Sequence, residues 1–246
     1  MSLNREGCAY DRLNDWFSSP AGHGVVAAID EKLKPILNQL RGENLLQIGI
    51  DRQFWHYNLF RFQHIHVLSP SIKASFATFT AELEAVPLAN ESIDCIIAPF
   101  ALELAIDSGQ LINELDRILS PMGYVIFIGV NPWGLWGMFS KYQKKSSFEP
   151  SKGSLHSAFS VRKCLQKKGY NIQLVDSFYY MPQVNSLTMQ TKLGFLNEVG
   201  KMLWPIPGGF YFMLAQKFQL NLLDVEPEPS YSEYVFNQTQ VTNRTL

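Results

Sequence analysis

Apolar residues recur along the chain with two periods, and the longer period predicts helices. Between residues 23 and 40 apolar side chains fall at helical spacing, and Pro35 within this pattern predicts a kink or a break. Residues 110–119 form a second amphipathic pattern, with charged side chains on the opposite side. A third helix is predicted to begin at Ser160, as its N-cap, and to end at Gly169.

Short apolar runs between these helices predict buried strands. They cover residues 44–49, 65–68, 92–98, 124–128, 171–178 and 210–216. Nearly continuous apolar strands that alternate with amphipathic helices are typical of a mainly parallel sheet with helices on both faces. The pattern therefore predicts a doubly wound α/β domain.

Composition narrows the class of protein. The 246 residues are 46% hydrophobic and 17% charged, which suits one large domain with an ample core. The net charge of −1 excludes a globally basic nucleic-acid binder but allows a local basic patch. Cys8, Cys95 and Cys164 are far apart and form no C-x-x-C pair, so we expect neither a disulfide framework nor a zinc site. Residues 1–10 lack a signal-peptide pattern and no apolar run reaches ~18 residues, so we expect a cytoplasmic protein.

The same pattern divides the chain into three parts. Residues 1–43 are predicted to form an N-terminal helical cap, and residues 44–217 form the α/β domain. Within that domain, residues 131–160 are an insertion that we interpret as a lid. From residue 218 the apolar periodicity fades, and residues 218–246 are predicted to be a disordered polar tail.

Three segments, in order, resemble a known family. Residues 81–94, A-E-L-E-A-V-P-L-A-N-E-S-I-D, resemble the segment D-A-x-x-L-P-F-x-x-x-S-F-D of class I S-adenosylmethionine (SAM)-dependent methyltransferases. Leu102-Glu103 stands where that family begins a helix with L-x-H or L-E, and residues 111–123 resemble its segment ending in R-x-L-x-P-x-G. The flanks, residues 16–22 and 131–137, look like a proteobacterial branch of the type 11 methyltransferases.

The resemblance implies a fold, an activity and a cofactor. The fold is the Rossmann-like methyltransferase fold, an α/β doubly wound, mainly parallel seven-stranded sheet with the last strand antiparallel. The activity is transfer of a methyl group from SAM. The implied cofactor-binding residues are Gln47, Gly49, Ile50, Asp51, Ser69, Glu82, Leu83, Pro99 and Phe100. Within this set, Glu82 and Leu83 stand where the family contacts adenine, and Pro99 and Phe100 stand beneath the methionine. We identify no catalytic base and no metal ligand, because positioning alone carries much of the barrier reduction in many such enzymes.

Two departures from the family affect the cofactor site. The motif acid-x-G-x-G-x-G appears as Q-I-G-I-D-R-Q over residues 47–53, so Gly49 alone survives, and side chains at positions 51 and 53 narrow the approach of the backbone to a ligand. The acid for the ribose hydroxyls is replaced by Ser69, which should weaken binding by about tenfold, and Asp51 can supply part of the lost charge. The alternative function is therefore a catalytically degenerate methyltransferase fold that serves as a ligand- or partner-binding module.

The insertion after residue 130 combines aromatic and basic residues. Trp133, Trp136, Phe139 and Tyr142 recur every three residues. Between residues 137 and 168, eight basic residues face one acid, a balance of eight minus one, or +7. We interpret this segment as a substrate lid for a small-molecule or anionic acceptor, with a nucleic acid or a membrane surface as further candidates. The alternative is a solvated helix face beside a buried aromatic cluster.

Overall fold

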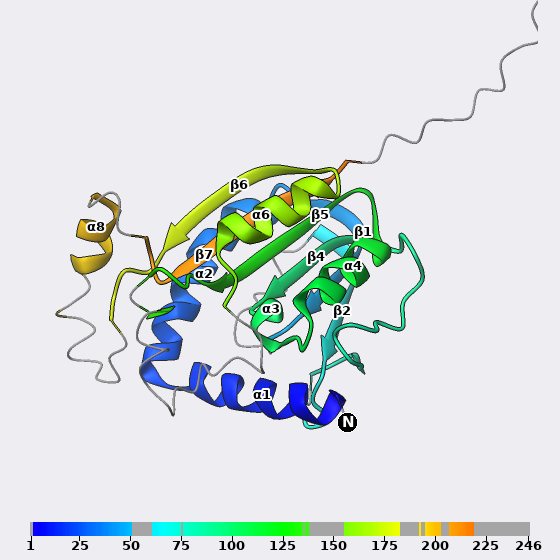
Figure 1. Ribbon diagram of the computed structural model, residues 1–246, viewed down its shortest axis with the longest axis horizontal. Coiled ribbons are helices and arrows are strands. Elements are labelled where there is room, and N and C mark those ends of the chain that lie inside the picture. Colours follow the sequence, from blue (N-terminus) through cyan, green and yellow to red (C-terminus); the bar gives the residue numbers. More distant parts are fainter. Residues whose placement is uncertain are drawn as a thin grey trace, which may run out of the picture.

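A single sheet with helices on both of its faces organises the chain (Figure 1). The computed structural model describes residues 2–50, 61–74, 76–134, 136–137, 155–182, 192, 195–202 and 207–218. Among these residues, no helix is long and apolar enough to cross a membrane.

The sheet has the predicted architecture. Its strands are β1 (Arg41–Ile48), β2 (Arg61–Ser69), β3 (Phe79–Thr80), β4 (Ile93–Pro99), β5 (Leu119–Val130), β6 (Tyr170–Phe178) and β7 (Phe210–Lys217). Their order in the seven-stranded sheet is β3-β2-β1-β4-β5-β7-β6. The first five strands of this order pair in parallel, whereas β7 is antiparallel to both β5 and β6. The predicted parallel sheet with an antiparallel last strand is confirmed.

Helices cover both faces and one edge of this sheet. They are α1 (Ser2–Phe17), α2 (Pro20–Leu37), α3 (Ala101–Leu104), α4 (Ser108–Ile118), α6 (Ala158–Lys167) and α8 (Phe195–Met202). In Figure 1, α3, α4 and α6 lie in front of the sheet, α2 passes behind it, and α1 runs along the edge toward which the arrowheads of β2 and β4 point. Four apolar residues of α4, including Leu111 and Leu115, are buried, as its amphipathic pattern predicted.

The helix boundaries correct three details of the sequence analysis. The N-cap of α6 is Ser157 rather than Ser160, because the Ser157 hydroxyl accepts a hydrogen bond from the Ser160 amide at 3.2 Å. Of the kink or break predicted near Pro35, the break is wrong, because α2 continues through Pro35 to Leu37. Helix α1 lies within the predicted N-terminal helical cap, for which the apolar pattern gave no helix bounds before residue 23, and α8 and the two-residue strand β3 were not predicted. Gly169 follows α6 with a φ of +85°, the left-handed conformation expected of a glycine after a helix.

Asp116 on α4 holds the beginning of β6 and the end of β7 against the rest of the domain. Its carboxylate accepts hydrogen bonds from the Tyr170 hydroxyl at 2.9 Å and the Lys168 ammonium at 3.0 Å. Lys217, the last residue of β7, donates to the carbonyls of Asp116 at 2.7 Å and Leu119 at 2.9 Å. The Lys217 side chain is only 6% exposed, and these carbonyls and the nearby carboxylate compensate for the burial of its charge.

Candidate cofactor site

The turn after β1 is built around Gly49. Its φ is +107°, and a Cβ added there would collide with the carbonyl oxygen of Pro99 at the end of β4. The buried Gln47 side chain donates from Nε2 to the Ile50 carbonyl at 2.7 Å and so fixes the shape of the turn. Glycine is required at this position both for its conformation and for the close approach of two backbones.

The end of β4 holds Phe100 in a left-handed conformation. Its φ and ψ are 56° and 17°, its amide donates to the Ile128 carbonyl at 2.7 Å, and its side chain is fully buried. The ring lies 5.2 Å from that of Phe17 and 5.7 Å from that of Phe210, measured between centroids. A left-handed phenylalanine costs free energy that the surrounding packing has to offset, and such strain gathers at functional turns. Phe100 is therefore a core residue that also shapes the end of the strand.

Ser69, at the end of β2, closes its own turn. Its hydroxyl accepts from the Ser71 amide at 3.0 Å and lies 3.3 Å from the Ser71 carbonyl oxygen. The side chain is buried and both contacts are internal to the loop. Ser69 thus holds the loop after β2 in place, and its hydroxyl is already engaged at the position where the family has an acid for the ribose.

Leu83, in the loop after β3, presents its backbone amide to a carboxyl group from far away in the sequence. This amide donates to Oε2 of Glu6 on α1 at 3.2 Å, and both residues are fully buried. Burial above all, and then the neighbouring Glu84, raise the pKa of Glu6 to about 8. Glu82 beside them is partly exposed. Sequence reasoning missed Glu6, because its partner lies 77 positions away and no local pattern encodes the contact.

A second buried acid, Glu103 on α3, lies beside the end of β5. Its Oε1 accepts from the Val130 amide at 2.7 Å. Within the described part of the chain, its Oε2 and the hydroxyl of the fully buried Tyr211 have no hydrogen-bond partner. Burial raises the pKa of Glu103 to about 7. Gly129 leaves room for this pair, because a Cβ there would press on the Tyr211 hydroxyl and on Glu103 Oε1.

The structure brings most of the predicted site residues to one edge of the sheet. Gln47, Gly49 and Ile50 at β1, Ser69 at β2, Leu83 after β3, and Pro99 and Phe100 at β4 all lie at or just beyond the carboxyl ends of parallel strands. In open α/β sheets, ligands bind in the crevice outside these ends. Asp51 lies outside the described residues, as do Phe139, Tyr142 and the basic residues between 138 and 154.

The aromatic residues of the insertion divide into two environments. Trp136 is buried and donates from its indole nitrogen to the Met181 carbonyl at 2.7 Å. Its ring lies 5.3 Å from that of Trp16. Trp133, in contrast, is 74% exposed. The interpretation as a buried aromatic cluster is therefore right for Trp136 and wrong for Trp133, because Asn131 turns the chain by accepting the Trp133 amide on its side chain at 3.1 Å.

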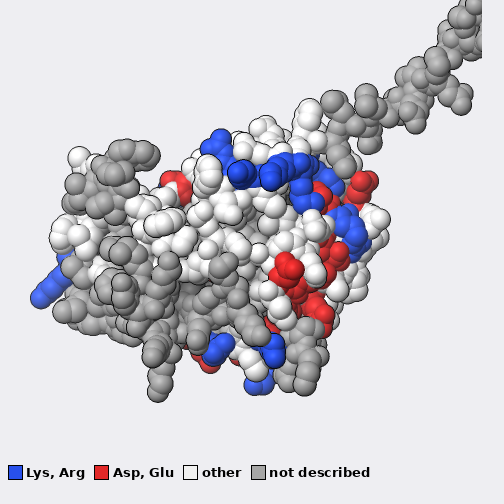
Figure 2. All heavy atoms as spheres, in the orientation of Figure 1, with Lys and Arg blue, Asp and Glu red and all other residues white. Residues whose placement is uncertain are grey.

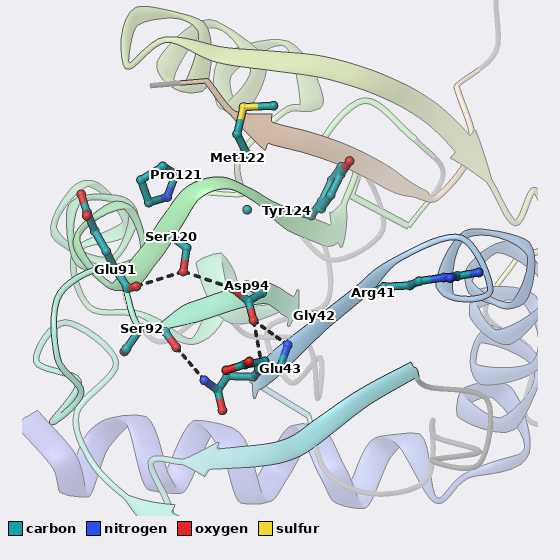
Figure 3. A pocket seen from close by; sticks show the side chains of 12 residues that line it. Arg41, Gly42, Glu43, Glu91, Ser92, Asp94, Ser120, Pro121, Met122 and Tyr124 are labelled. Carbon is teal, nitrogen blue, oxygen red and sulfur yellow. Dashed lines mark hydrogen bonds between the residues drawn. The ribbon is translucent and has the colours of Figure 1, made fainter. Parts of the chain in front are cut away.

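A pocket of about 600 Å³ lies at the opposite edge of the sheet (Figure 3). It is lined by the beginnings of β1, β4 and β5, and Asp94 lies at its centre. The Asp94 carboxylate accepts from the amides of Glu43 at 2.7 Å and Asn44 at 3.0 Å, and from the Ser120 hydroxyl at 3.3 Å. The last acid of the segment 81–94 therefore ties three strands together at the amino edge, away from the carboxyl edge.

Comparisons with known proteins agree with this geometry. Residues 60–127 match the family model of a methyltransferase domain. A SAM-dependent methyltransferase from Thermotoga maritima, a possible histamine N-methyltransferase, superposes with a TM-score of 0.55 at 19% identity, covering 75% of this chain and 87% of that one. The fold is that of the class I methyltransferases.

Two more solved structures share this methyltransferase fold. The putative methyltransferase of Haloferax volcanii, in complex with a methyltransferase activator, gives a TM-score of 0.58 at 14% identity, covering 84% of this chain and 98% of that one. Phosphoethanolamine N-methyltransferase 2 of Haemonchus contortus, in complex with SAM, gives a TM-score of 0.57 at 16% identity, covering 84% of this chain and 56% of that one.

A curated relative matches over a shorter part of the chain. The uncharacterized protein YafS of Escherichia coli is 25% identical over 123 residues, which are 50% of this chain and 50% of the relative. The chain therefore spans about half the length of this relative.

The residues present fit a SAM molecule at two of its three parts. The Gly49 turn and the left-handed Phe100 form a close backbone corner at the carboxyl edge, which suits the methionine end. The amide of Leu83 is a hydrogen-bond donor that suits a heterocyclic acceptor such as a purine nitrogen, once it is released from the Glu6 carboxyl group to which it donates in this structure. The ribose end is different, because the hydroxyl of Ser69 is engaged with Ser71.

Proposed function

We propose that the chain is a SAM-dependent methyltransferase. The observation that carries the proposal is the corner between Gly49 and Pro99, where a glycine of positive φ brings the turn after β1 against the end of β4 at the carboxyl edge. The family model over residues 60–127 and the methyltransferase fold support it. When bound, the cofactor would supply a methyl group on a sulfonium, which is transferred to the acceptor by in-line displacement.

The residues of this chain would contribute position and exclusion of water. Gly49 and Ile50 would hold the methionine end, Leu83 and Glu82 would border the adenine, and the fully buried Phe100 would close the floor. Holding two reactants in line supplies a large part of the barrier reduction in such displacements, so no general base is required for the step itself.

The acceptor that we propose carries a negative charge. The support is the excess of eight basic residues over one acid between residues 137 and 168, directly after β5. A solved protein of the same fold is named a phosphoethanolamine N-methyltransferase, and its named substrate carries a phosphate. Lysine and arginine side chains attract such groups by charge, and of the basic residues in this segment Arg162, Lys163 and Lys167 on α6 are exposed, whereas Lys168 is paired with Asp116.

Calorimetric titration of the full chain with SAM, and with its demethylated product S-adenosylhomocysteine, tests the proposed function. We expect saturable heat with both ligands and a rise in melting temperature. Absence of both heat and thermal shift at millimolar ligand would refute it. A radiolabelled methyl-transfer screen against cell extract, fractionated into RNA, protein and lipid, then identifies the class of acceptor.

A further inference from the structure

Helix α1 lies across the carboxyl edge where the proposed cofactor site is located. Its Glu6 accepts the Leu83 amide beyond β3. One turn further on, Asp11 accepts a hydrogen bond from the Ser71 hydroxyl beyond β2 at 2.6 Å. A Cβ at Gly7 would lie 3.1 Å from the Pro70 carbonyl oxygen, so the helix backbone passes very close to this loop.

The far end of α1 reaches the two central strands. The ring of Phe17 packs on Phe100, which follows β4, with 5.2 Å between centroids. The ring of Trp16 packs edge-on against Trp136, which follows β5, with 5.3 Å between centroids. From its first turn to its last, α1 therefore contacts the segments that follow β3, β2, β4 and β5, and it covers the crevice in which ligands of open α/β sheets bind.

Burial of the Glu6 carboxyl group destabilises the contact between α1 and the carboxyl edge. The residue is fully buried, and its carboxyl group faces a second acid, Glu84, with which it shares a hydrogen bond only while one of the two carries a proton. The acidic groups facing it are Glu84 and Glu82, which disfavour its ionisation. Burial and the like charge of the neighbouring acids both oppose ionisation of Glu6, so the arrangement that contains it is destabilised wherever pH favours the carboxylate. The contact between α1 and the carboxyl edge is thus weakened at the Leu83 amide, the backbone donor that Glu6 engages.

We propose that α1 and SAM compete for the carboxyl edge: the Glu6 carboxyl holds the Leu83 amide, and the first turns of α1 have to move away before the cofactor binds. This inference rests on the proposed function for the identity of the ligand. The contact itself, between a buried acid on α1 and a backbone donor at the ligand edge, identifies Glu6 as the competing group.

Competition through a carboxyl group makes cofactor binding depend on pH. With its pKa raised to about 8, Glu6 keeps its proton near neutral pH while it is buried against Leu83. A Glu6 released into water ionises with an ordinary pKa near ~4.3. Opening therefore releases a proton, and SAM affinity should rise by up to about tenfold per pH unit as pH approaches 8 and then level off.

Titration of SAM into three variants of the full chain tests the competition. Glu6→Ala removes the competing acceptor, and we expect it to bind SAM about fivefold more tightly, as one released hydrogen bond allows. Glu6→Gln keeps an oxygen for the Leu83 amide without an ionisable group, so its affinity should not change between pH 6 and pH 8. Glu31→Gln, an exposed glutamate on α2, is the matched control and should follow the wild type.

Hydrogen exchange gives an independent readout. We expect SAM to speed the exchange of backbone amides in the first turns of α1 and to slow it around residues 44–50. Slower exchange in α1 with SAM, or unchanged or weaker binding by Glu6→Ala, would overturn the competition alone. Failure of the wild type and of every variant to bind SAM would overturn the proposed function as well, so the two failures are distinguishable.

Discussion

At the scale of single residues, Gly49 is the position where local conformation and site geometry meet. The backbone at position 49 has a positive φ that L residues rarely adopt, and a side chain there would collide with the carbonyl oxygen of Pro99. We predict that Gly49→Ala destabilises the protein by about 2–4 kcal/mol, the sum of backbone strain and overpacking. Urea unfolding followed by circular dichroism measures the change.

Gly109 provides the matched control for this substitution. It lies exposed in α4, and an added Cβ would meet only an oxygen of Asp107 at 3.2 Å. Gly109→Ala should change stability by less than about 1 kcal/mol, in the direction set by helix propensity. Equal effects of the two substitutions would show that the corner at Gly49 is not a constraint.

Glu103 makes the stability of the fold depend on pH. Burial raises its pKa to about 7 in the folded protein, whereas the unfolded chain has an ordinary value, so its contribution to stability is fully present below the unfolded pKa. This contribution is lost as pH rises from about 4.5 to about 7, by up to ~3 kcal/mol. We predict that Glu103→Gln, which keeps the acceptor for Val130, gains stability relative to the wild type over this range. Parallel curves of melting temperature against pH for the two proteins would contradict the prediction.

At the scale of elements, Asp116 holds α6, β6 and β7 against α4. Removal of its carboxylate leaves the buried Lys217 ammonium with carbonyl partners only, and removes the partners of Lys168 and Tyr170. Because the Asp116 side chain is one-quarter exposed, we expect Asp116→Ala to cost about 2–3 kcal/mol, at the lower end for a broken buried ion pair. Urea unfolding measures this, with the exposed Asp15→Ala on α1 as control, which should stay near the wild-type midpoint.

The elements differ in how well local sequence predicts them. The strands β4 and β7 are buried on both faces over nearly their whole length, as are the second halves of β1 and β5, so their apolar runs alone identify them. The apolar pattern does not define the bounds of helix α1, because the buried face of this helix mixes apolar side chains such as Tyr10 with the acid Glu6. The environment of Glu6 is created by Leu83, far along the chain. The two-residue β3 is too short to carry a period of its own.

The same distinction applies to the site. The position of Gly49 follows from the motif, because a glycine directly after a buried strand constrains the backbone locally. The roles of Ser69 and Glu103 depend on which backbone groups the folded chain brings to them, and the sequence does not contain that information in local form.

At the scale of the whole molecule, charge is unevenly distributed. Figure 2 shows a row of basic side chains over α6 and acidic side chains nearer to α3 and α4. Arg162, Lys163 and Lys167 on α6 are exposed and belong to the basic segment found in the sequence, and Phe159 beside them is 74% exposed. A basic face with an exposed aromatic residue suits an anionic acceptor or surface.

We predict that this segment recruits its acceptor by charge. Changing Lys144, Lys145 and Lys152 together to Ala should weaken binding to RNA or to anionic lipid vesicles by at least about tenfold, without a change in melting temperature or in SAM affinity. The exposed Lys34→Ala on α2 serves as control. Added salt should weaken the wild-type interaction, because exposed charges are screened within ~8–10 Å. Unaltered binding by the triple variant at low and moderate salt would favour a solvated face without a recruiting role.

The position of β7 between β5 and β6 has a consequence for how the protein is made. During synthesis β5 and β6 leave the ribosome well before β7, and in the finished sheet β6 is hydrogen-bonded to β7 only. Until residues 210–217 emerge, one edge of β5 and the whole of β6 lack their native strand partner. Chains with unpaired apolar edges are prone to aggregate, and insertion of a late strand between two earlier ones is a slow, non-local step. A nascent chain that stalls before residue 210 is therefore expected to depend on chaperones for its solubility.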